Sequence, residues 1–369
     1  MTTLRAAVCV RAGEPLVIEE LELDAPRSGE VLVRMAASGV CRSDLHQANG
    51  DWGERVPVVL GHEGAGYVEA LGEGVSDLEV GVLVALNWFF PCDACAQCVA
   101  ARPWMCTGTS ALDDALPGGR RPLRRADGTE IFQMLAIGTF AERAVVPARA
   151  VVSMPEGVPP EVAALIGCGA TTGVMSVLRA ASVPAGASVA VIGLGGVGMS
   201  AIMGAVVAGA STIVAVDRVA EKIDRARSFG ATHAVAAGED AGAVRDSIAE
   251  ATGGDGPDFV FDCIGFPSTA ELAIESAGPG GTAVLVGIPA AGERASFDVG
   301  ALIDRSAGIV GSNYGWSMPD EDFPYLAGLF LEGRLPLDRL IDQRIRLYEV
   351  NGALDALRRG EGLRRVIVF

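Results

Sequence analysis

Basic charge is scarce in this chain of 369 residues. Aspartate and glutamate outnumber lysine and arginine by 46 to 29, which gives a formal net charge of -17. Such a chain would repel a phosphate backbone, and no dense basic stripe interleaved with aromatic residues offsets that repulsion. Nucleic acid is therefore not an expected partner.

The sequence also lacks secretion and membrane signals. The segment from Met1 to Val8 contains no long apolar region followed by a cleavage site. We also identify no run of the roughly 18 apolar residues that a membrane span needs. These absences predict a soluble, cytoplasmic protein without a membrane partner, in a compartment where disulfides are rare.

Histidine is scarce too, with three residues against eight cysteines, yet four cysteines lie close together in the run Cys-x2-Cys-x2-Cys-x7-Cys. Four thiolates at such spacings can surround one Zn²⁺ and leave no open position, as a structural zinc site requires. A disulfide pair and an iron-sulfur centre are the alternatives, although the spacing differs from that of bacterial ferredoxins. The run predicts a structural zinc lobe over residues 92–106, with ligands Cys92, Cys95, Cys98 and Cys106.

Few soft ligands then remain for a second metal. Any such site must draw its cysteines and histidines from Cys9, Cys41, Cys168, Cys263, His46, His62 and His233.

With 369 residues, the chain is expected to form two domains, because single cores stop growing at roughly 250 to 300 residues.

The N-terminal third consists of short strand-like runs separated by glycine and proline. Short strands at this spacing favour an antiparallel barrel or sandwich. The runs are Glu30 to Ala36, Val56 to Leu60, Gly66 to Leu71, Val80 to Leu86 and Phe140 to Val146.

The middle of the chain reads as a βαβ unit with a glycine-rich turn. An apolar run from Ser188 ends in Gly193-Leu-Gly195-Gly196-Val197-Gly198, and a helical pattern continues to about Ala208. The three spaced glycines allow a tight turn, a close approach to a pyrophosphate and close helix-strand contact.

An acidic residue, Asp217, ends the next strand, where a carboxylate can hold the adenosine ribose hydroxyls. It would repel the additional phosphate of NADP, so NAD is favoured, although Arg218 and Lys222 lie close by and could soften that preference. Strand-like runs at 233–236, 258–262 and 282–287 complete a doubly wound parallel sheet.

The segment Gly61-His62-Glu63-x2-Gly66-x5-Gly72-x2-Val75 resembles the signature of zinc-dependent medium-chain alcohol dehydrogenases. The cysteine lobe and the glycine turn follow it in the order of that family. The resemblance implies an α/β protein in which a GroES-like β-rich catalytic domain, residues 1–169 and 313–369, is interrupted by a Rossmann domain over 170–312.

The resemblance also implies a catalytic zinc bound by Cys41, His62 and Cys168, which makes two Zn²⁺ per chain. Three protein ligands leave a fourth position for water or substrate. By the same resemblance Asp44 orients His62, and Glu63 can approach the metal or pair with an arginine.

Further roles follow from matching positions. Ser43 takes the alcohol proton and passes it through the cofactor ribose to His46 at the surface. The cofactor contacts are Arg42 and one of Arg364 or Arg365 at the pyrophosphate, with Thr172 and Val197 at the nicotinamide, while Trp52 and Trp88 line the substrate cleft.

The implied activity is that of an NAD-dependent oxidoreductase that converts a primary or aromatic alcohol to the aldehyde, by hydride transfer from a zinc-bound alkoxide. Three segments are similar to the class III and mycothiol-dependent formaldehyde dehydrogenase branch: Leu86 to Trp88, Ala126 to Glu130 and Ser312 to Trp316. This resemblance makes a thiol adduct the alternative substrate. Its cationic contacts would come from Arg120, Arg121, Arg124 and Arg125. A zinc-free enone reductase and a non-catalytic nucleotide-binding protein are the alternatives of other classes.

The segment from Thr107 to Ile137 is long for a simple connection. Relatives with a longer connection here are often dimers, so we expect a homodimer paired through the Rossmann sheets, with a tetramer as the other possibility.

Overall fold

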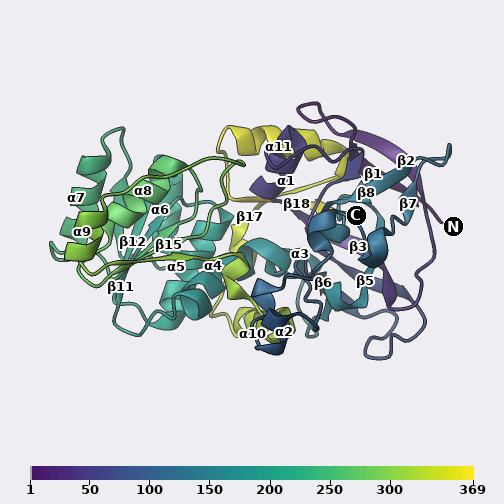
Figure 1. Cartoon of the computed structure of the whole chain (residues 1–369), viewed down its shortest axis with the longest axis horizontal. Helices are drawn as coiled ribbons and strands as arrows, with labels where there is room; N and C mark the ends of the chain where they lie inside the picture. The colour runs from purple at the N-terminus through teal and green to yellow at the C-terminus, as the bar shows by residue number, and fades with distance from the viewer. Residues whose placement is uncertain (1) are drawn as a thin grey trace. The chain divides into compact units, whose positions relative to one another are not determined.

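A computed structural model describes residues 2–369 and divides the chain into two units. Unit 1 comprises residues up to Cys168 together with 318–333 and 337–369. Unit 2 comprises Gly169–Ser317 and the short stretch 334–336. Figure 1 shows the β-rich unit 1 and the α/β unit 2.

The units differ from the predicted domains at Gly169, at 313–317 and at 334–336, all of which were predicted in the catalytic domain and cluster with unit 2. The first two differences shift the boundaries by one and by five residues. The stretch 313–317 packs within unit 2 because Gly315, at φ +68°, lies against Met175; an added Cβ would come 2.7 Å from the Met175 side chain. Ser312 and Ser176 also share a hydrogen bond of 2.8 Å.

The first strands of unit 1 close into a barrel. Its order is β1 (Thr2–Cys9), β2 (Val17–Leu23), β7 (Leu123–Arg124), β8 (Glu130–Gln133) and β4 (Val58–Val59). Leu116, Leu123 and Ile131 are fully buried in the same apolar cluster as β1 and β2. The segment 107–137, which looked like a long connection, therefore builds the barrel wall and core.

A second sheet of unit 1 is mixed rather than purely antiparallel. Its order is β10 (Val151–Ser153), β6 (Leu83–Leu86), β5 (Glu63–Leu71), β3 (Glu30–Val40), β18 (Arg364–Val368) and β17 (Ile341–Ile345), with β9 (Arg143–Pro147) also pairing with β3. β18 pairs antiparallel with β3 and parallel with β17. The C-terminal segment thus returns to the first part of the chain, as expected.

Several predicted strands are shorter than expected, and two of them have a clear local cause. The run at 56–60 keeps only β4, because Pro57 has no N–H to donate to a sheet. The run at 80–86 begins at Leu83, because Val80 is exposed and Gly81 turns with φ +92°.

Unit 2 contains a parallel sheet of six strands, and the predicted doubly wound fold is confirmed. Its order is β13 (His233–Ala236), β12 (Thr212–Asp217), β11 (Ser188–Ile192), β14 (Phe259–Asp262), β15 (Thr282–Leu285) and β16 (Gly308–Gly311). The helices that pack against or flank it are α5 (Gly196–Ala208), α6 (Ala220–Ser228), α7 (Ala241–Ala251), α8 (Pro267–Ser276) and α9 (Val299–Asp304). Its central strands β11, β12 and β14 are buried on both faces, as in a sheet covered on both sides.

The helical segment Pro160–Ala180 is long and apolar enough to span a membrane, which corrects the expectation that no segment reaches this length. In this structure 83% of its apolar window is buried. Such burial is typical of a core helix. It comprises α3 (Pro160–Leu165), α4 (Thr171–Met175) and two π-helical turns, Ile166–Ala170 and Ser176–Ala180.

Candidate functional site

Four buried side chains of unit 1 converge on one point. One donor atom from each of Cys41, His62, Glu63 and Cys168 lies within 4.8 Å of every other. Cys41 directly precedes α1 (Arg42–Asn49), His62 directly precedes β5, and Cys168 lies in the first π-helical turn. Such turns occur frequently at functional sites because they redirect side chains within a helix.

Glycines allow these segments to approach one another. A Cβ on Gly39 would lie 2.1 Å from the carboxylate Oε2 of Glu63. Strand β3 therefore needs a glycine at this position to leave room for the Glu63 side chain. Likewise a Cβ on Gly167 would lie 2.8 Å from the Leu86 carbonyl oxygen, so this glycine lets the helix that carries Cys168 reach β6.

Asp44 holds two of the cluster residues in place. Its fully buried carboxylate accepts hydrogen bonds from the Cys41 N–H at 2.8 Å and the Gly61 N–H at 3.2 Å, and it pairs with His62 Nδ1 at 2.8 Å. His62 Nε2 has no hydrogen-bond partner although it is buried. Two thiols and an imidazole nitrogen left without a partner are the donors that catalytic zinc takes, so the residues fit the metal.

Glu63 faces Arg364 inside the same cluster. The Glu63 Oε1 lies 3.2 Å from the Arg364 guanidinium, and both side chains are buried. Burial raises the pKa of Glu63 to about 8, against the attraction of Arg364. The hydrogen bond with Cys168, aided by Arg364, lowers the pKa of the Cys41 thiol well below its usual value. Arg364 therefore stabilises negative charge among the candidate ligands.

The four lobe cysteines form the second cluster of metal-binding character among residues 2–369. Their sulfur atoms lie close, at 3.5 Å between Cys95 and Cys98 and 3.9 Å between Cys95 and Cys106, and all remain free thiols. A backbone hydrogen bond lowers the pKa of Cys95 to about 5. This closed set of four thiols fits a structural zinc.

The glycine turn of unit 2 has a shape that fits a pyrophosphate. Gly193 adopts φ +91°, and a Cβ on Gly198 would lie 1.8 Å from the Gly193 carbonyl oxygen. A Cβ on Gly195 would meet nothing within 4 Å. The turn therefore leaves open space beside Gly195, at the N-terminus of α5, where phosphate groups bind.

Asp217 fastens this turn. Its carboxylate accepts the Leu194 N–H at 2.7 Å and the Val219 N–H at 2.9 Å. Arg218, directly after Asp217, is exposed, and Lys222 is half-buried in the first turn of α6. A Cβ on Gly173, the neighbour of Thr172, would lie 2.3 Å from the Val197 carbonyl oxygen, so α4 approaches the start of α5.

Comparisons with known proteins agree with this geometry. A family model described as "Alcohol dehydrogenase GroES-like domain" matches residues 27–156, and one described as "Zinc-binding dehydrogenase" matches 196–332. The chain is 38% identical to an NDMA-dependent alcohol dehydrogenase of Amycolatopsis methanolica, over 99% of this chain and 98% of that protein.

The chain belongs to the zinc-dependent medium-chain alcohol dehydrogenase family.

Two further relatives are similar over nearly the whole chain. An S-(hydroxymethyl)glutathione dehydrogenase of Paracoccus denitrificans is 32% identical over 99% of both chains. The crystal structure of a benzyl alcohol dehydrogenase from Acinetobacter calcoaceticus has a TM-score of 0.90 at 30% identity and covers all of both chains. Membership in this family supports zinc and a nicotinamide dinucleotide as cofactors.

The sequence predicts His46 at the surface, but most of its side chain is covered. Its side chain is 13% exposed, its Nδ1 lies 2.7 Å from the Asp51 carboxylate, and its ring stacks on Trp52 with the centroids 5.0 Å apart. Trp52 is thus placed beside His46, whereas Ser43 is half-buried in the first turn of α1. Trp88 is 9% exposed and packs edge-on against Phe89.

The basic run is not a free cationic patch. Arg120 pairs with Glu30 at 2.6 Å and with Asp24 at 3.3 Å, while Arg124 pairs with Asp24 and Arg125 with Glu19. Arg121 lies over the Phe132 ring, 4.0 Å from its centroid. Arg120, Arg124 and Arg125 thus join the 107–137 segment to acidic residues of the N-terminal strands and their connections.

Two arginines predicted to contact the cofactor, Arg42 and Arg365, lie outside the cluster of candidate zinc ligands. Arg42 is exposed at the start of α1, and Arg365 donates to Gln343 and to the Glu361 carbonyl. Arg364 lies beside the candidate zinc ligands and pairs with Glu63. Of the two roles considered for Glu63, the structure therefore shows the pairing with an arginine. His233, expected to be structural, is exposed on β13 and bonds to Thr232.

Sequence reasoning missed Asp51. The signal that could have revealed it is Gly50, a residue that commonly ends a helix and turns the next residue back toward it.

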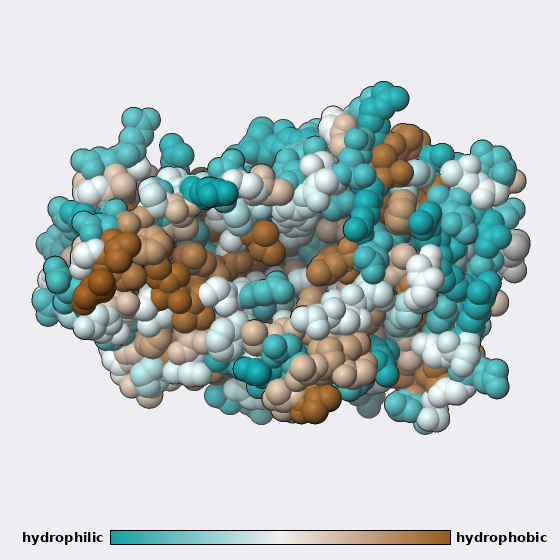
Figure 2. All heavy atoms as spheres, in the orientation of Figure 1, coloured by the Kyte–Doolittle hydropathy of each residue, from teal (hydrophilic) through white to brown (hydrophobic). Residues whose placement is uncertain are grey.

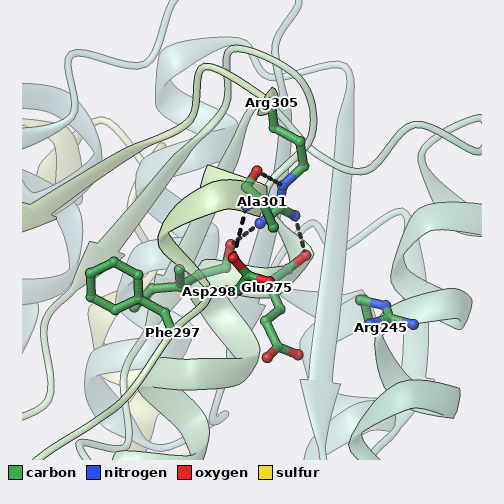
Figure 3. A pocket seen from close by; sticks show the side chains of 7 residues that line it. Arg245, Glu275, Phe297, Asp298, Ala301 and Arg305 are labelled. Atoms are coloured by element: carbon green, nitrogen blue, oxygen red, sulfur yellow. Dashed lines mark hydrogen bonds between the residues drawn. The ribbon is translucent and has the colours of Figure 1, made fainter. Parts of the chain in front are cut away.

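A separate hollow of about 450 Å³ in unit 2 is lined in part by Arg305 and Asp298, which already take part in hydrogen bonds (Figure 3). Arg305 donates to the carbonyls of Ile274, Glu275, Ala277 and Ala301, and Asp298 accepts the Ala301 N–H. These contacts cap helices α8 and α9, which accounts for the positions of Arg305 and Asp298.

Proposed function

We propose that the chain is an NAD-linked alcohol dehydrogenase that uses one catalytic and one structural Zn²⁺ to oxidise a primary or aromatic alcohol to its aldehyde. The observation that carries this proposal is the buried donor set Cys41, His62 and Cys168, with Asp44 behind the imidazole. Similarity to a benzyl alcohol dehydrogenase supports the substrate class.

The protein's own groups have distinct parts in this reaction. A zinc ion bound by the three donors would act as a Lewis acid and make the alcohol hydroxyl easier to deprotonate. Asp44 orients His62 as a ligand, and burial of the cluster excludes water. Ser43 accepts the hydroxyl proton, and His46 receives it next. A bound nicotinamide would supply the acceptor for the hydride that the alcohol carbon loses.

NAD is the proposed dinucleotide because Asp217 ends β12 beside the glycine turn. A carboxylate at that place repels a ribose phosphate. Arg218 and Lys222 are the groups that would let NADP bind in part.

The test is the pair of ligand variants His62→Ala and Cys168→Ser. Each should lower the zinc content from about two to about one per chain and abolish alcohol-dependent NADH formation at 340 nm, with an unchanged circular dichroism spectrum. The matched control is His233→Ala, which removes an exposed imidazole on β13 and should keep both zinc ions. A ligand variant that still reduces NAD would refute the assignment.

The thiol adduct of formaldehyde is the second candidate substrate. Similarity to an S-(hydroxymethyl)glutathione dehydrogenase favours it, and the internal pairing of Arg120, Arg124 and Arg125 weighs against it, because these arginines are not available for an anionic thiol. Formaldehyde should be oxidised faster with glutathione or mycothiol than without if this candidate is right.

The hydride acceptor has an alternative as well. Because a relative at 38% identity is named NDMA-dependent, NDMA should be supplied in place of free NAD in the same alcohol assay. Alcohol oxidation with NDMA and without added NAD would replace the NAD-linked proposal. A non-catalytic protein with an empty active site would instead hold about one zinc ion per chain, and a zinc-free reductase would hold none.

For partners we propose a small-molecule substrate and a second copy of the chain, in the cytoplasm. Strand β16 pairs only with β15 within residues 2–369, so one edge of the sheet is open. Exposed apolar side chains lie on and before α9: Phe297, Val299 and Ile303. Figure 2 shows apolar atoms gathered over this part of unit 2. These features support a homodimer.

A further inference from the structure

A histidine, a carboxylate and an indole meet at the end of α1 in unit 1. His46 Nδ1 lies 2.7 Å from Asp51 Oδ2, and the imidazole stacks on the Trp52 ring with an angle of 25° between the planes. The His46 side chain is 13% exposed and that of Asp51 is 29% exposed. The imidazole is therefore enclosed on one face and bonded at one nitrogen.

The sequence builds this arrangement through Gly50. This residue ends α1 with φ +78°, a left-handed conformation that glycine adopts without strain. The Gly50 N–H then bonds to the Gln47 carbonyl, and the Asp51 N–H to the His46 carbonyl at 3.0 Å. The turn returns Asp51 to the residue whose ring its carboxylate contacts.

We propose that Asp51 is a positioning residue that holds His46 in the tautomer that the proton relay needs. Nδ1–H donates to Asp51, which leaves the lone pair of Nε2 as the proton acceptor. Nε2 takes up one proton, the ring becomes an imidazolium stabilised by the carboxylate, and Nε2 later releases that proton to water. The inference rests on the proposed dehydrogenase function and adds a residue to it.

Two arginines near α1 are already paired with other groups. Helix α11 (Val350–Arg358) packs against α1, and its Arg358 bonds to Asp355 and to Asn49. Arg359, just beyond, bonds to Glu361. Within residues 2–369, Asp51 is the one ionisable side chain that bonds to the His46 ring. In serine proteases a buried aspartate holds the catalytic histidine in this way, and its asparagine variant fails because the tautomer is wrong.

The test compares Asp51→Asn with Asp51→Glu and with Glu54→Gln. The asparagine variant should lower kcat/KM for alcohol oxidation about tenfold to a hundredfold at neutral pH, a loss typical of an impaired general base. The loss should shrink toward about pH 10, where hydroxide can take the proton directly. Asp51→Glu should restore most of the rate. Glu54→Gln removes the same charge nearby and should match the wild type.

Imidazole nitrogen NMR supplies a readout that needs no turnover. The chain has three histidines, so ¹⁵N-histidine labelling gives a simple spectrum, and His46→Gln assigns the signal. His46 should show protonated Nδ1 and bare Nε2 in the wild type, and should lose this preference in Asp51→Asn.

An unchanged tautomer, or a wild-type kcat/KM at neutral pH in Asp51→Asn, would overturn the inference. A wild type that oxidises no alcohol would count against the proposed function, whereas the NMR spectrum would still decide the role of Asp51.

Discussion

Asp44 shows how one buried residue can serve several others. Its carboxylate accepts the N–H groups of Cys41 and Gly61 and pairs with His62 Nδ1. A buried carboxylate without such partners would be costly, so its hydrogen bonds explain its position as well as its proposed task. The residue fixes the backbone of one candidate ligand and the imidazole of another.

Changing Asp44 should therefore weaken the catalytic metal site without emptying the lobe. Asp44→Asn keeps the size of the side chain, but it loses the charge that orients His62. Zinc affinity at this site should fall about tenfold to a hundredfold, the usual effect of removing such a partner. Competition with a chromogenic chelator measures the change. Asp77→Asn, on an exposed loop, is the control, and equal zinc retention in both variants would contradict the prediction.

The residues of the candidate site differ in how far sequence could reach them. Motif spacing led to the four converging donors and to the lobe, because backbone segments of fixed length place them. The pairings of Arg364, Asp51 and Arg120 were out of reach, since each joins side chains whose partner depends on tertiary packing. For instance, Arg120 and Glu30 are 90 positions apart.

At the scale of the element, the turn before α5 separates two functions of glycine. Gly195→Ala meets open space at an allowed backbone conformation, φ -78° and ψ -170°, so the fold should remain intact. Its methyl group would occupy the side that a pyrophosphate approaches, and the KM for NAD should rise about tenfold or more, equal to about 1.4 kcal/mol.

Gly198→Ala should behave in the opposite way. Its methyl group would lie 1.8 Å from the Gly193 carbonyl, so unfolding free energy should fall by at least about 1 to 3 kcal/mol. Thermal melting and NAD titration of both variants make the comparison. Similar melting curves for the two variants would contradict the prediction, because they would show that a methyl group at position 198 fits beside the Gly193 carbonyl.

The cysteine lobe should be separable from the chemistry. Cys95→Ser removes one of four thiolates, so one zinc ion per chain should be lost and the melting temperature should fall. The KM for alcohol should change little in the folded protein. Cys263→Ser, outside both clusters, is the matched control and should keep both metals. Loss of both zinc ions from Cys95→Ser would contradict two independent sites.

Elements with strong local signals were predicted well. The run at 258–262 is β14 to within one residue, and the helix before Ala208 ends there, because a buried parallel strand and a capped helix are encoded locally. The barrel strands β7 and β8 were missed, since each is short and exists through pairing with distant partners. Pairing between strands far apart in sequence leaves little local pattern.

For the whole molecule, the open edge of the parallel sheet predicts self-association. Ile303 is 69% exposed and Val299 is 59% exposed, so a charge placed there should prevent a second copy from covering this face. Val299→Lys with Ile303→Glu should convert a dimer into a monomer in sedimentation velocity. The control Val80→Lys changes an exposed apolar residue of unit 1 and should leave the dimer. A wild-type monomer would exclude the proposed assembly.

Lysine occurs once in the whole chain, at Lys222 in the first turn of α6, close in sequence to Asp217. An acylating reagent would thus mark a single side chain besides the amino terminus, and intact-mass spectrometry would count the adducts without digestion. If a bound dinucleotide shields that amine, the extent of acylation at Lys222 would report how much of the protein holds the cofactor.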